Sequence, residues 1–175
     1  MLIVNIFYLH EVPEEAAIMH CDKHVVKMVL ESGQMLSTCF RLRHQYTTDK
    51  DGHIKFISMG KMYENVYKMA HVNHPSTIWV TQSLQHWNWL YRLFCALCDE
   101  YTFRYGKIHM TDNKLRELFS TPPQFLEDNG FTPPPQCMFD EYKCEDTVQA
   151  YRQYYLGAKK GFLNYTKREK PEWVK

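Results

Sequence analysis

The sequence has few glycines, no long apolar run and no excess of charge of either sign. Seven glycines in 175 residues argue against a nucleotide-binding fold built on glycine-rich phosphate loops. No window approaches 18 uninterrupted apolar residues, so we expect no membrane span. Twenty-one Lys and Arg residues against 20 Asp and Glu residues give a net charge of +1. This balance excludes a uniformly basic nucleic-acid binder but allows a local basic patch.

The sequence also lacks signs of export or of a structural metal. Residues 1–10 carry neither a basic region nor a long apolar stretch, so we expect no signal peptide and a cytoplasmic protein. Six cysteines in such a protein are expected to be reduced thiols. The CxxC pair of Cys95 and Cys98 has no second pair to complete a zinc site. We therefore predict no metal and no cofactor.

What remains is an ordinary globular composition, with 45% apolar, 23% charged and 15% aromatic residues. The length suits one domain over residues 1–175. Proline and cap signals predict a mainly α helical bundle interrupted by irregular proline-rich segments. Asp51-Gly52 indicates a loop or a small hairpin near residues 46–58. The predicted helices cover residues 13–41, 60–71, 75–105, 111–119 and 146–165.

Charge is concentrated in the C-terminal helix and tail, about residues 146–175. Residues 151–175 contain seven basic and two acidic side chains, a net charge of +5, which leaves −4 for the rest of the chain. A basic, tyrosine-rich end fits a phosphate-contacting surface and equally a solvated helix face.

The first predicted helix carries a narrow polar strip on a mostly apolar surface. At about 100° per residue, one arc collects His20, Lys23, His24, Lys27, Glu31 and Gln34. Because the apolar arc is the wider one, we expect other elements to cover this helix. The strip would then face a cleft or a buried polar network.

Three interpretations of the strip stay open. His20 and His24 have the i, i+4 spacing of two metal ligands on one helical turn. The strip also fits a structural polar network, since buried charges need partners. In the third interpretation, clustered groups with shifted pKa values perform acid–base or nucleophilic chemistry. Asp22, on the flank of the strip, would then orient Lys23 or a histidine.

Further candidates surround the helix predicted over 75–105. His74 lies just before its start, where it would either cap the helix or help to bind an anion. Glu100 and Arg104 are spaced i, i+4 and are expected to pair. The helix exit combines cationic and aromatic groups suited to phosphate contact and base stacking: Arg104, Tyr105, Lys107 and His109. The stiff segment 131–138 fits a pocket wall and a surface crossing equally well.

The order of these segments resembles the phage-type pyrimidine-dimer DNA glycosylases of the endonuclease V type. The resemblance rests on short matches at the start, middle and end of the chain. They are Ala17–His24, His74-Pro75, Glu100 with Arg104–Lys107, and the end Arg168-Glu169-Lys170-Pro171-Glu172-Trp173, which looks like the family's Arg-x-Pro-x-Trp with one residue inserted. Residues 110–150 have no counterpart.

The resemblance implies an all-α domain that binds duplex DNA and breaks an N-glycosidic bond. In that family the nucleophile is the α-amine exposed when the initiator Met is removed, and a Glu on the first helix assists. This sequence departs from the pattern at both points. Leu2 is bulky, which normally keeps Met1 in place, and Asp22 and Lys23 stand where the Glu would fall.

We therefore expect a DNA glycosylase, with or without lyase activity, that acts on a damaged or modified pyrimidine in the cytoplasm, that of the host cell if the protein is phage-encoded. The DNA would dock on the helix exit and on Arg168, Lys170 and Trp173. The extruded base would enter a cleft beside the first helix. Asp22, His20 and His24 would stabilise a sugar cation or activate water, and Lys23 or Lys27 would supply charge or an imine-forming amine.

Two alternatives stay open: a metal-dependent hydrolase of nucleotides or small phosphates, and a non-catalytic DNA-binding accessory protein. A hydrolase would use His20, His24 and a carboxylate as metal ligands. In an accessory protein the polar strip would only support the fold. The sequence does not predict the oligomeric state.

Overall fold

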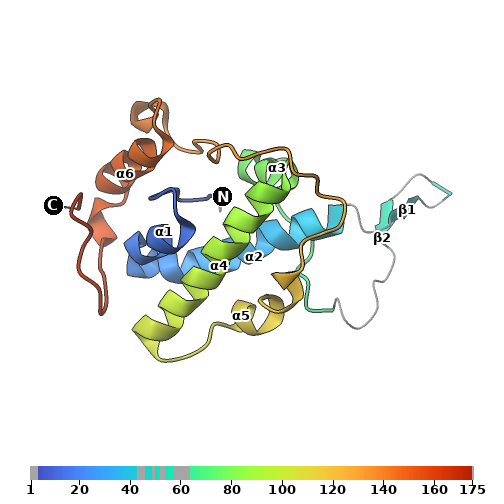
Figure 1. Cartoon of the computed structure of the whole chain (residues 1–175), viewed down its shortest axis with the longest axis horizontal. Helices are drawn as coiled ribbons and strands as arrows, with labels where there is room; N and C mark the ends of the chain where they lie inside the picture. The colour runs from blue at the N-terminus through green and yellow to red at the C-terminus, as the bar shows by residue number, and fades with distance from the viewer. Residues whose placement is uncertain (1–3, 43–45, 49, 52–53, 57–63, 175) are drawn as a thin grey trace.

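Six α-helices and one two-stranded hairpin form most of the described chain, as the computed structural model shows (Figure 1). The structure describes residues 4–42, 46–48, 50–51, 54–56 and 64–174. The predicted mainly α fold class is confirmed. The hairpin pairs β1 (Tyr46–Thr48) with β2 (Ile54–Phe56) in antiparallel register, with Thr47 opposite Lys55. It lies within the region where the sequence indicates a loop or a hairpin.

The first predicted helix is broken into α1 (Pro13–Met19) and α2 (Asp22–Leu42). Proline at the first position and two glutamates in the first turn start α1 as expected. His20 then adopts an extended conformation with ψ 133° and ends the helix. The prediction of one unbroken helix over 13–41 is therefore wrong, and His20 does not lie on the same helix as His24.

The second long helix is also broken, into α3 (Pro75–Thr81) and α4 (Leu84–Tyr105). Ser83 caps α4 because its hydroxyl accepts a hydrogen bond from the Gln85 N–H at 3.2 Å. Gly106 ends α4 with a left-handed φ of 68°, a conformation that glycine adopts without strain.

The remaining helices are shorter than predicted. They are α5 (Met110–Leu115) and α6 (Thr147–Ala158), and Asp146 caps α6 through the N–H groups of Val148 and Gln149. Short 3-10 turns cover Leu118–Ser120, Asp140–Tyr142 and Lys160–Phe162. The helix predicted over 60–71 is not formed in residues 64–71, which make turns and irregular backbone. Residues 60–63 lie outside the described part.

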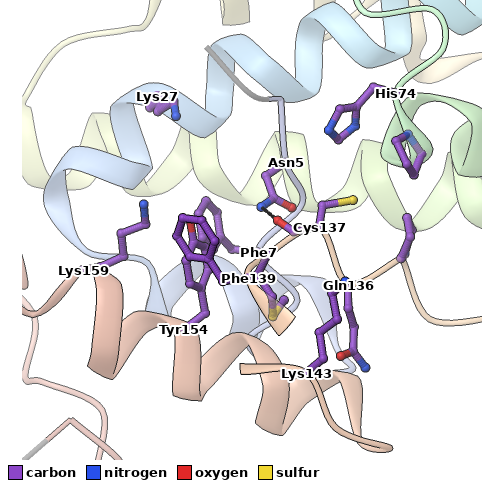
Figure 2. A pocket seen from close by; sticks show the side chains of 13 residues that line it. Asn5, Phe7, Lys27, His74, Gln136, Cys137, Phe139, Lys143, Tyr154 and Lys159 are labelled. Atoms are coloured by element: carbon purple, nitrogen blue, oxygen red, sulfur yellow. Dashed lines mark hydrogen bonds between the residues drawn. The ribbon is translucent and has the colours of Figure 1, made fainter. Parts of the chain in front are cut away.

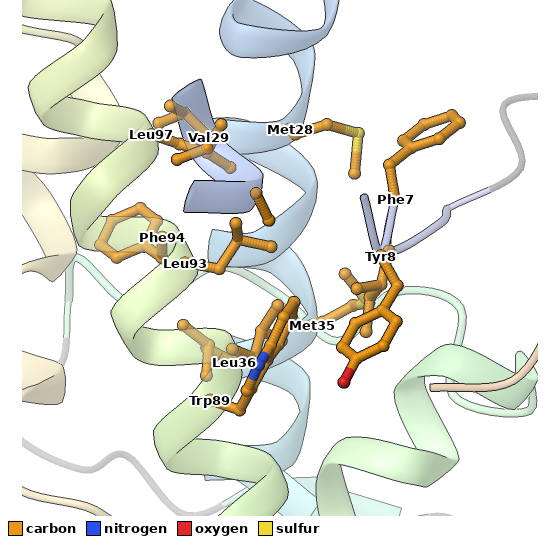
Figure 3. Packing of buried hydrophobic residues seen from close by; sticks show 14 of the residues in the cluster. Phe7, Tyr8, Met28, Val29, Met35, Leu36, Trp89, Leu93, Phe94 and Leu97 are labelled. Carbon is orange, nitrogen blue, oxygen red and sulfur yellow. The ribbon is translucent and has the colours of Figure 1, made fainter. Parts of the chain in front are cut away.

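The core is centred on the packing of α4 against α1 and α2. Figure 3 shows Val29 and Leu36 of α2 beside Leu93 and Leu97 of α4, all fully buried. The N-terminal segment, residues 4–9, is buried throughout and supplies Phe7 on the other side of α2. This segment continues toward α6 (Figure 1), and the candidate site lies where the two meet.

Candidate functional site

The two histidines of the predicted strip are inside the core. His20 is completely buried, its Nδ1 lies 2.6 Å from the Ala16 carbonyl oxygen, and its Nε2 has no hydrogen-bond partner among the described residues. Burial lowers the pKa of His20 to about 4, so the ring is neutral at pH 7. His20 therefore has no access to a substrate.

His24 is held between the N-terminal segment and α6. Its Nδ1 lies 2.5 Å from the Tyr155 hydroxyl, and its ring stacks on Phe7 with the centroids 4.3 Å apart. Burial lowers the pKa of His24 to about 2. In the described part of the chain no group of three or more His, Cys, Asp or Glu side chains is placed to hold a metal ion. Because both rings are buried and held by these contacts, the geometry does not support His20 and His24 as metal ligands or catalytic groups, and both belong to a structural network.

Asp22 connects the C-terminal tail to α2 and α4. Its carboxylate accepts hydrogen bonds from the Thr166 N–H at 2.9 Å, the Thr166 hydroxyl at 2.8 Å and Arg104 at 3.0 Å. These partners occupy both of its oxygens. The predicted catalytic role of Asp22 therefore has no support in the geometry.

Arg104 is fully buried and does not reach a DNA phosphate, contrary to the prediction. Its guanidinium forms the expected ion pair with Glu100 at 3.0 Å. It also donates to the carbonyl oxygens of Ile18 and His20 at 3.0 and 2.8 Å. Those carbonyls lie at the end of α1, where a helix leaves its last acceptors unpaired. Arg104 thus stabilises the break between α1 and α2.

A pocket of about 610 Å³ lies between the N-terminal segment, α2, the start of α3, residues 135–143 and α6 (Figure 2). This volume is in the range of small-molecule sites. Residues 135–139 form one wall, so of the two interpretations of the proline-rich segment the pocket wall is the one observed. The sequence predicts a cleft beside the first helix but not its other walls, because these come from segments far apart in the chain.

Lys27 is the predicted catalytic residue that borders this pocket. Its Nζ lies 3.2 Å from Glu31 Oε1. Glu31 is buried and also accepts a hydrogen bond from the Asn5 N–H at 3.1 Å. Burial raises the pKa of Glu31. Lys23, one turn earlier on α2, is instead exposed outside the pocket, with its Nζ 4.8 Å from the centre of the Phe162 ring.

The pocket is basic and aromatic. Lys27, Lys143 and Lys159 line it together with three aromatic rings, and none of the described lining residues is acidic. Lys143 is paired with exposed Asp140 at 2.7 Å, and the Lys159 Nζ lies 4.7 Å from the centre of the Tyr154 ring. Cationic and aromatic groups together suit a phosphorylated ligand with a planar ring.

His74 lies at the other end of the pocket, beside Cys137 (Figure 2). Its Nδ1 accepts a hydrogen bond from the Ser76 N–H at 3.2 Å, so the capping role considered for it is observed. Burial lowers the pKa of His74, which favours a neutral ring. His74 therefore presents a polar, uncharged surface to this end of the pocket.

The other predicted DNA contacts lie at the end of α4 and on the tail, and none of them lines the pocket. Figure 1 places the end of α4 below α2, and α3 and α6 above it. Lys107, just after α4, and Lys170, on the tail, are both exposed. Tyr105 donates to the Asp22 carbonyl oxygen at 3.2 Å, and His109 caps α5. Of the residues predicted to contact DNA in these two segments, only Lys107 and Lys170 are exposed and have no structural role in the described part of the chain.

Arg168 and Trp173 hold the tail against the body of the protein. The Arg168 guanidinium pairs with Glu100 and lies 4.4 Å over the Phe103 ring. Trp173 is half-buried, with its ring centroid 5.9 Å from that of Tyr155. The structure therefore gives these two residues packing contacts.

No family model, curated protein or solved structure matches this sequence. In the described residues no helix is long and apolar enough to cross a membrane. The pocket and its side chains are therefore the main basis for inferring function.

Proposed function

We propose that the protein removes a damaged or modified pyrimidine from DNA, with the Lys27 amine as nucleophile and Glu31 as its proton acceptor. The observation that carries this proposal is the pairing of Lys27 Nζ with the buried Glu31 carboxylate, 3.2 Å apart, at the wall of a pocket. An amine and a carboxylate are the two groups that an imine-forming glycosylase needs. The resemblance to pyrimidine-dimer glycosylases supports the same chemistry, although it places the amine elsewhere.

The pocket suits a nucleotide that has left the DNA stack. Enzymes that act on a base extrude it and hold it between aromatic or apolar side chains. Here Phe7 and Tyr154 supply aromatic surface, and the three lysines that line the pocket supply positive charge for a phosphate. A volume of about 610 Å³ is sufficient for a nucleotide.

The reaction begins when Glu31 takes a proton from the Lys27 ammonium group. Because burial raises the pKa of Glu31, its carboxylate is a stronger base than an exposed one. The neutral amine attacks C1′, and the bond between C1′ and the base breaks. Its electron pair leaves with the base, which takes up a proton. As the sugar ring opens to a protonated imine, Glu31 returns its proton to O4′. A proton is then lost from C2′ to water, and the C3′–O3′ bond breaks by β-elimination with the 3′ phosphate as the leaving group. Water finally hydrolyses the imine and restores the amine.

Reduction with borohydride tests this role of Lys27, because it converts the imine into a stable link to DNA. We expect the wild-type protein to form a covalent adduct with a duplex that contains an abasic site. Lys27→Gln should reduce the adduct at least about 100-fold. Lys23→Gln is the matched control, since Lys23 lies on the same helix outside the pocket, and it should keep wild-type yield.

Glu31→Gln tests the carboxylate separately. The amide oxygen can still accept the hydrogen bond from the Asn5 N–H, so we expect the fold to persist. Loss of the proton acceptor should slow adduct formation by at least about tenfold. An unchanged rate in Glu31→Gln would exclude Glu31, and no adduct with the wild-type protein would exclude the amine mechanism.

A further inference from the structure

Phe139 is an exposed aromatic residue at the edge of the pocket. The residue is 66% exposed although it lines the pocket. The Tyr154 ring lies behind it, with the centroids 6.4 Å apart and the planes at 77°. Phe7 lies 6.0 Å from Tyr154, with the two planes only 9° apart. The edge of the pocket thus presents an aromatic surface with its outermost ring uncovered.

The segment that carries Phe139 is fixed at several points. The Tyr151 hydroxyl donates to the Pro135 carbonyl oxygen at 2.7 Å, and the Asn5 side chain donates to the Cys137 carbonyl oxygen at 2.8 Å. Gln136 is hydrogen-bonded to the backbone of Cys144 in both directions, at 2.6 and 3.2 Å. Because the backbone of this segment is already held in this way, a ligand that covers the Phe139 ring orders little additional chain. Phe139 is therefore suited to bind a flat partner.

Positive charge lies next to this aromatic surface. Figure 2 shows Lys27 and Lys159 at the same end of the pocket as Phe139, Phe7 and Tyr154, and His74 and Cys137 at the other end. Lys27 is paired with Glu31. Lys159 contacts the face of Tyr154, which leaves its ammonium group able to bind an anion. A ligand with a flat ring joined to a phosphate would stack on the aromatic surface and bind the Lys159 ammonium group.

We infer that Phe139 stacks on the nucleobase at the mouth of the pocket while Lys159 contacts the phosphate on its sugar. The inference rests on the proposed function for the nature of the ligand, and it adds the residue that binds the base. A base linked to a phosphate occurs in a DNA strand and in a free nucleotide. The exposed position of Phe139 favours a strand, because a chain can continue outward from the pocket mouth.

Fluorescence anisotropy with a short labelled oligothymidylate tests this assignment without any chemical step. Stacking of one base contributes about 1–3 kcal/mol, so Phe139→Ala should weaken binding about tenfold. Phe139→Trp should restore it, because tryptophan also stacks. Phe103→Ala is the matched control, since Phe103 is 46% exposed but lies on α4 outside the pocket. It should bind like the wild type.

Lys159→Gln and free thymidylate complete the test. Removal of one phosphate contact should lower the slope of log affinity against log salt by about 1. Wild-type affinity in Phe139→Ala would overturn the inference, as would a loss in Phe103→Ala of equal size. If the protein binds free thymidylate but not the oligothymidylate, the assignment to a DNA strand is overturned. The anisotropy measurement uses no borohydride and is independent of the trapping experiment. If Phe139→Ala weakens binding but the wild-type protein forms no trapped adduct, the proposed reaction is rejected and the stacking site is kept.

Discussion

Asp22 illustrates how a single carboxylate fixes three segments of this protein. It accepts hydrogen bonds from Thr166 of the tail and from fully buried Arg104 of α4. A buried guanidinium requires partners, because an unpaired charge in the interior is costly. The Arg104 interactions explain why Asp22, Glu100 and the end of α1 lie together.

We expect Asp22→Asn to lower the free energy of unfolding by about 2 kcal/mol. The asparagine side chain carries no negative charge to balance Arg104. Its NH2 group also takes the place of one oxygen that accepts hydrogen bonds from Arg104 and Thr166. Urea unfolding of the variant measures the change. Glu14→Gln removes an exposed ion pair with Arg92 and should cost less than about 1 kcal/mol. Equal stability of Asp22→Asn and the wild type would show that Asp22 is not a structural connection.

The buried histidines make stability depend on pH. Burial lowers the pKa of His20 to about 4 and that of His24 to about 2, from 6.5. The unfolded chain therefore binds more protons than the folded one below pH 6.5. These two groups therefore do not reduce stability well above pH 6.5, and stability falls as the pH drops from 6.5 toward 4 for His20 and toward 2 for His24.

We expect the free energy of unfolding to fall by about 2 kcal/mol per pH unit between pH 6 and 5, because two histidines take up protons on unfolding. Burial also lowers the pKa values of His74, His86 and His109, which adds to the effect with the same sign. Urea titrations at several pH values give the slope. A flat profile in this range would contradict the neutral, buried state of the two rings.

At the scale of the elements, local signals in the sequence predict where helices start. Pro13, Pro75 and Asp146 begin α1, α3 and α6 as expected, because proline geometry and side-chain caps act within one turn. Gly106 ends α4 for an equally local reason. The mainly α fold class follows from such signals.

The break between α1 and α2 was not predicted because its cause is not local. No glycine or proline stands between residues 14 and 32. The partner for the last carbonyls of α1 is Arg104, which is 84 residues away from His20 in the sequence. The break between α3 and α4 did have a local signal in Ser83, a residue type favoured at helix N-termini.

Ser83→Ala tests that cap. The Ser83 hydroxyl accepts hydrogen bonds from the N–H groups of Gln85 and Asn129, both at 3.2 Å. Its loss should lower the free energy of unfolding by about 1 kcal/mol. Ser83→Asp keeps an acceptor and should retain most of the stability. If both variants are as stable as the wild type, the cap does not stabilise α4.

At the scale of the whole molecule, the candidate site depends on contacts that the sequence does not reveal. At about 100° per residue the sequence predicts one strip for His20, His24 and Lys27. The break after α1 separates His20 from the other two. Long-range packing then turns the His24 ring toward Tyr155 and leaves Lys27 at the pocket. Phe139 and Lys159 could not be assigned to a site, because only the tertiary fold brings them beside Phe7.

The same packing separates the two kinds of surface that were expected to cooperate. The exposed lysines predicted to contact DNA, Lys107 and Lys170, are not among the residues that line the pocket. The cations at the pocket are Lys27, Lys143 and Lys159. If the proposed function holds, the pocket side, and not the end of α4, contacts the nucleotide.

The most direct measurement of the central proposal is to identify the residue that links to DNA. The wild-type protein is incubated with an abasic-site duplex and borohydride, digested with a protease, and analysed by mass spectrometry. The proposal predicts a single modified residue, Lys27. A modification at Lys23 or at the terminal amine, or no modification at all, would contradict it.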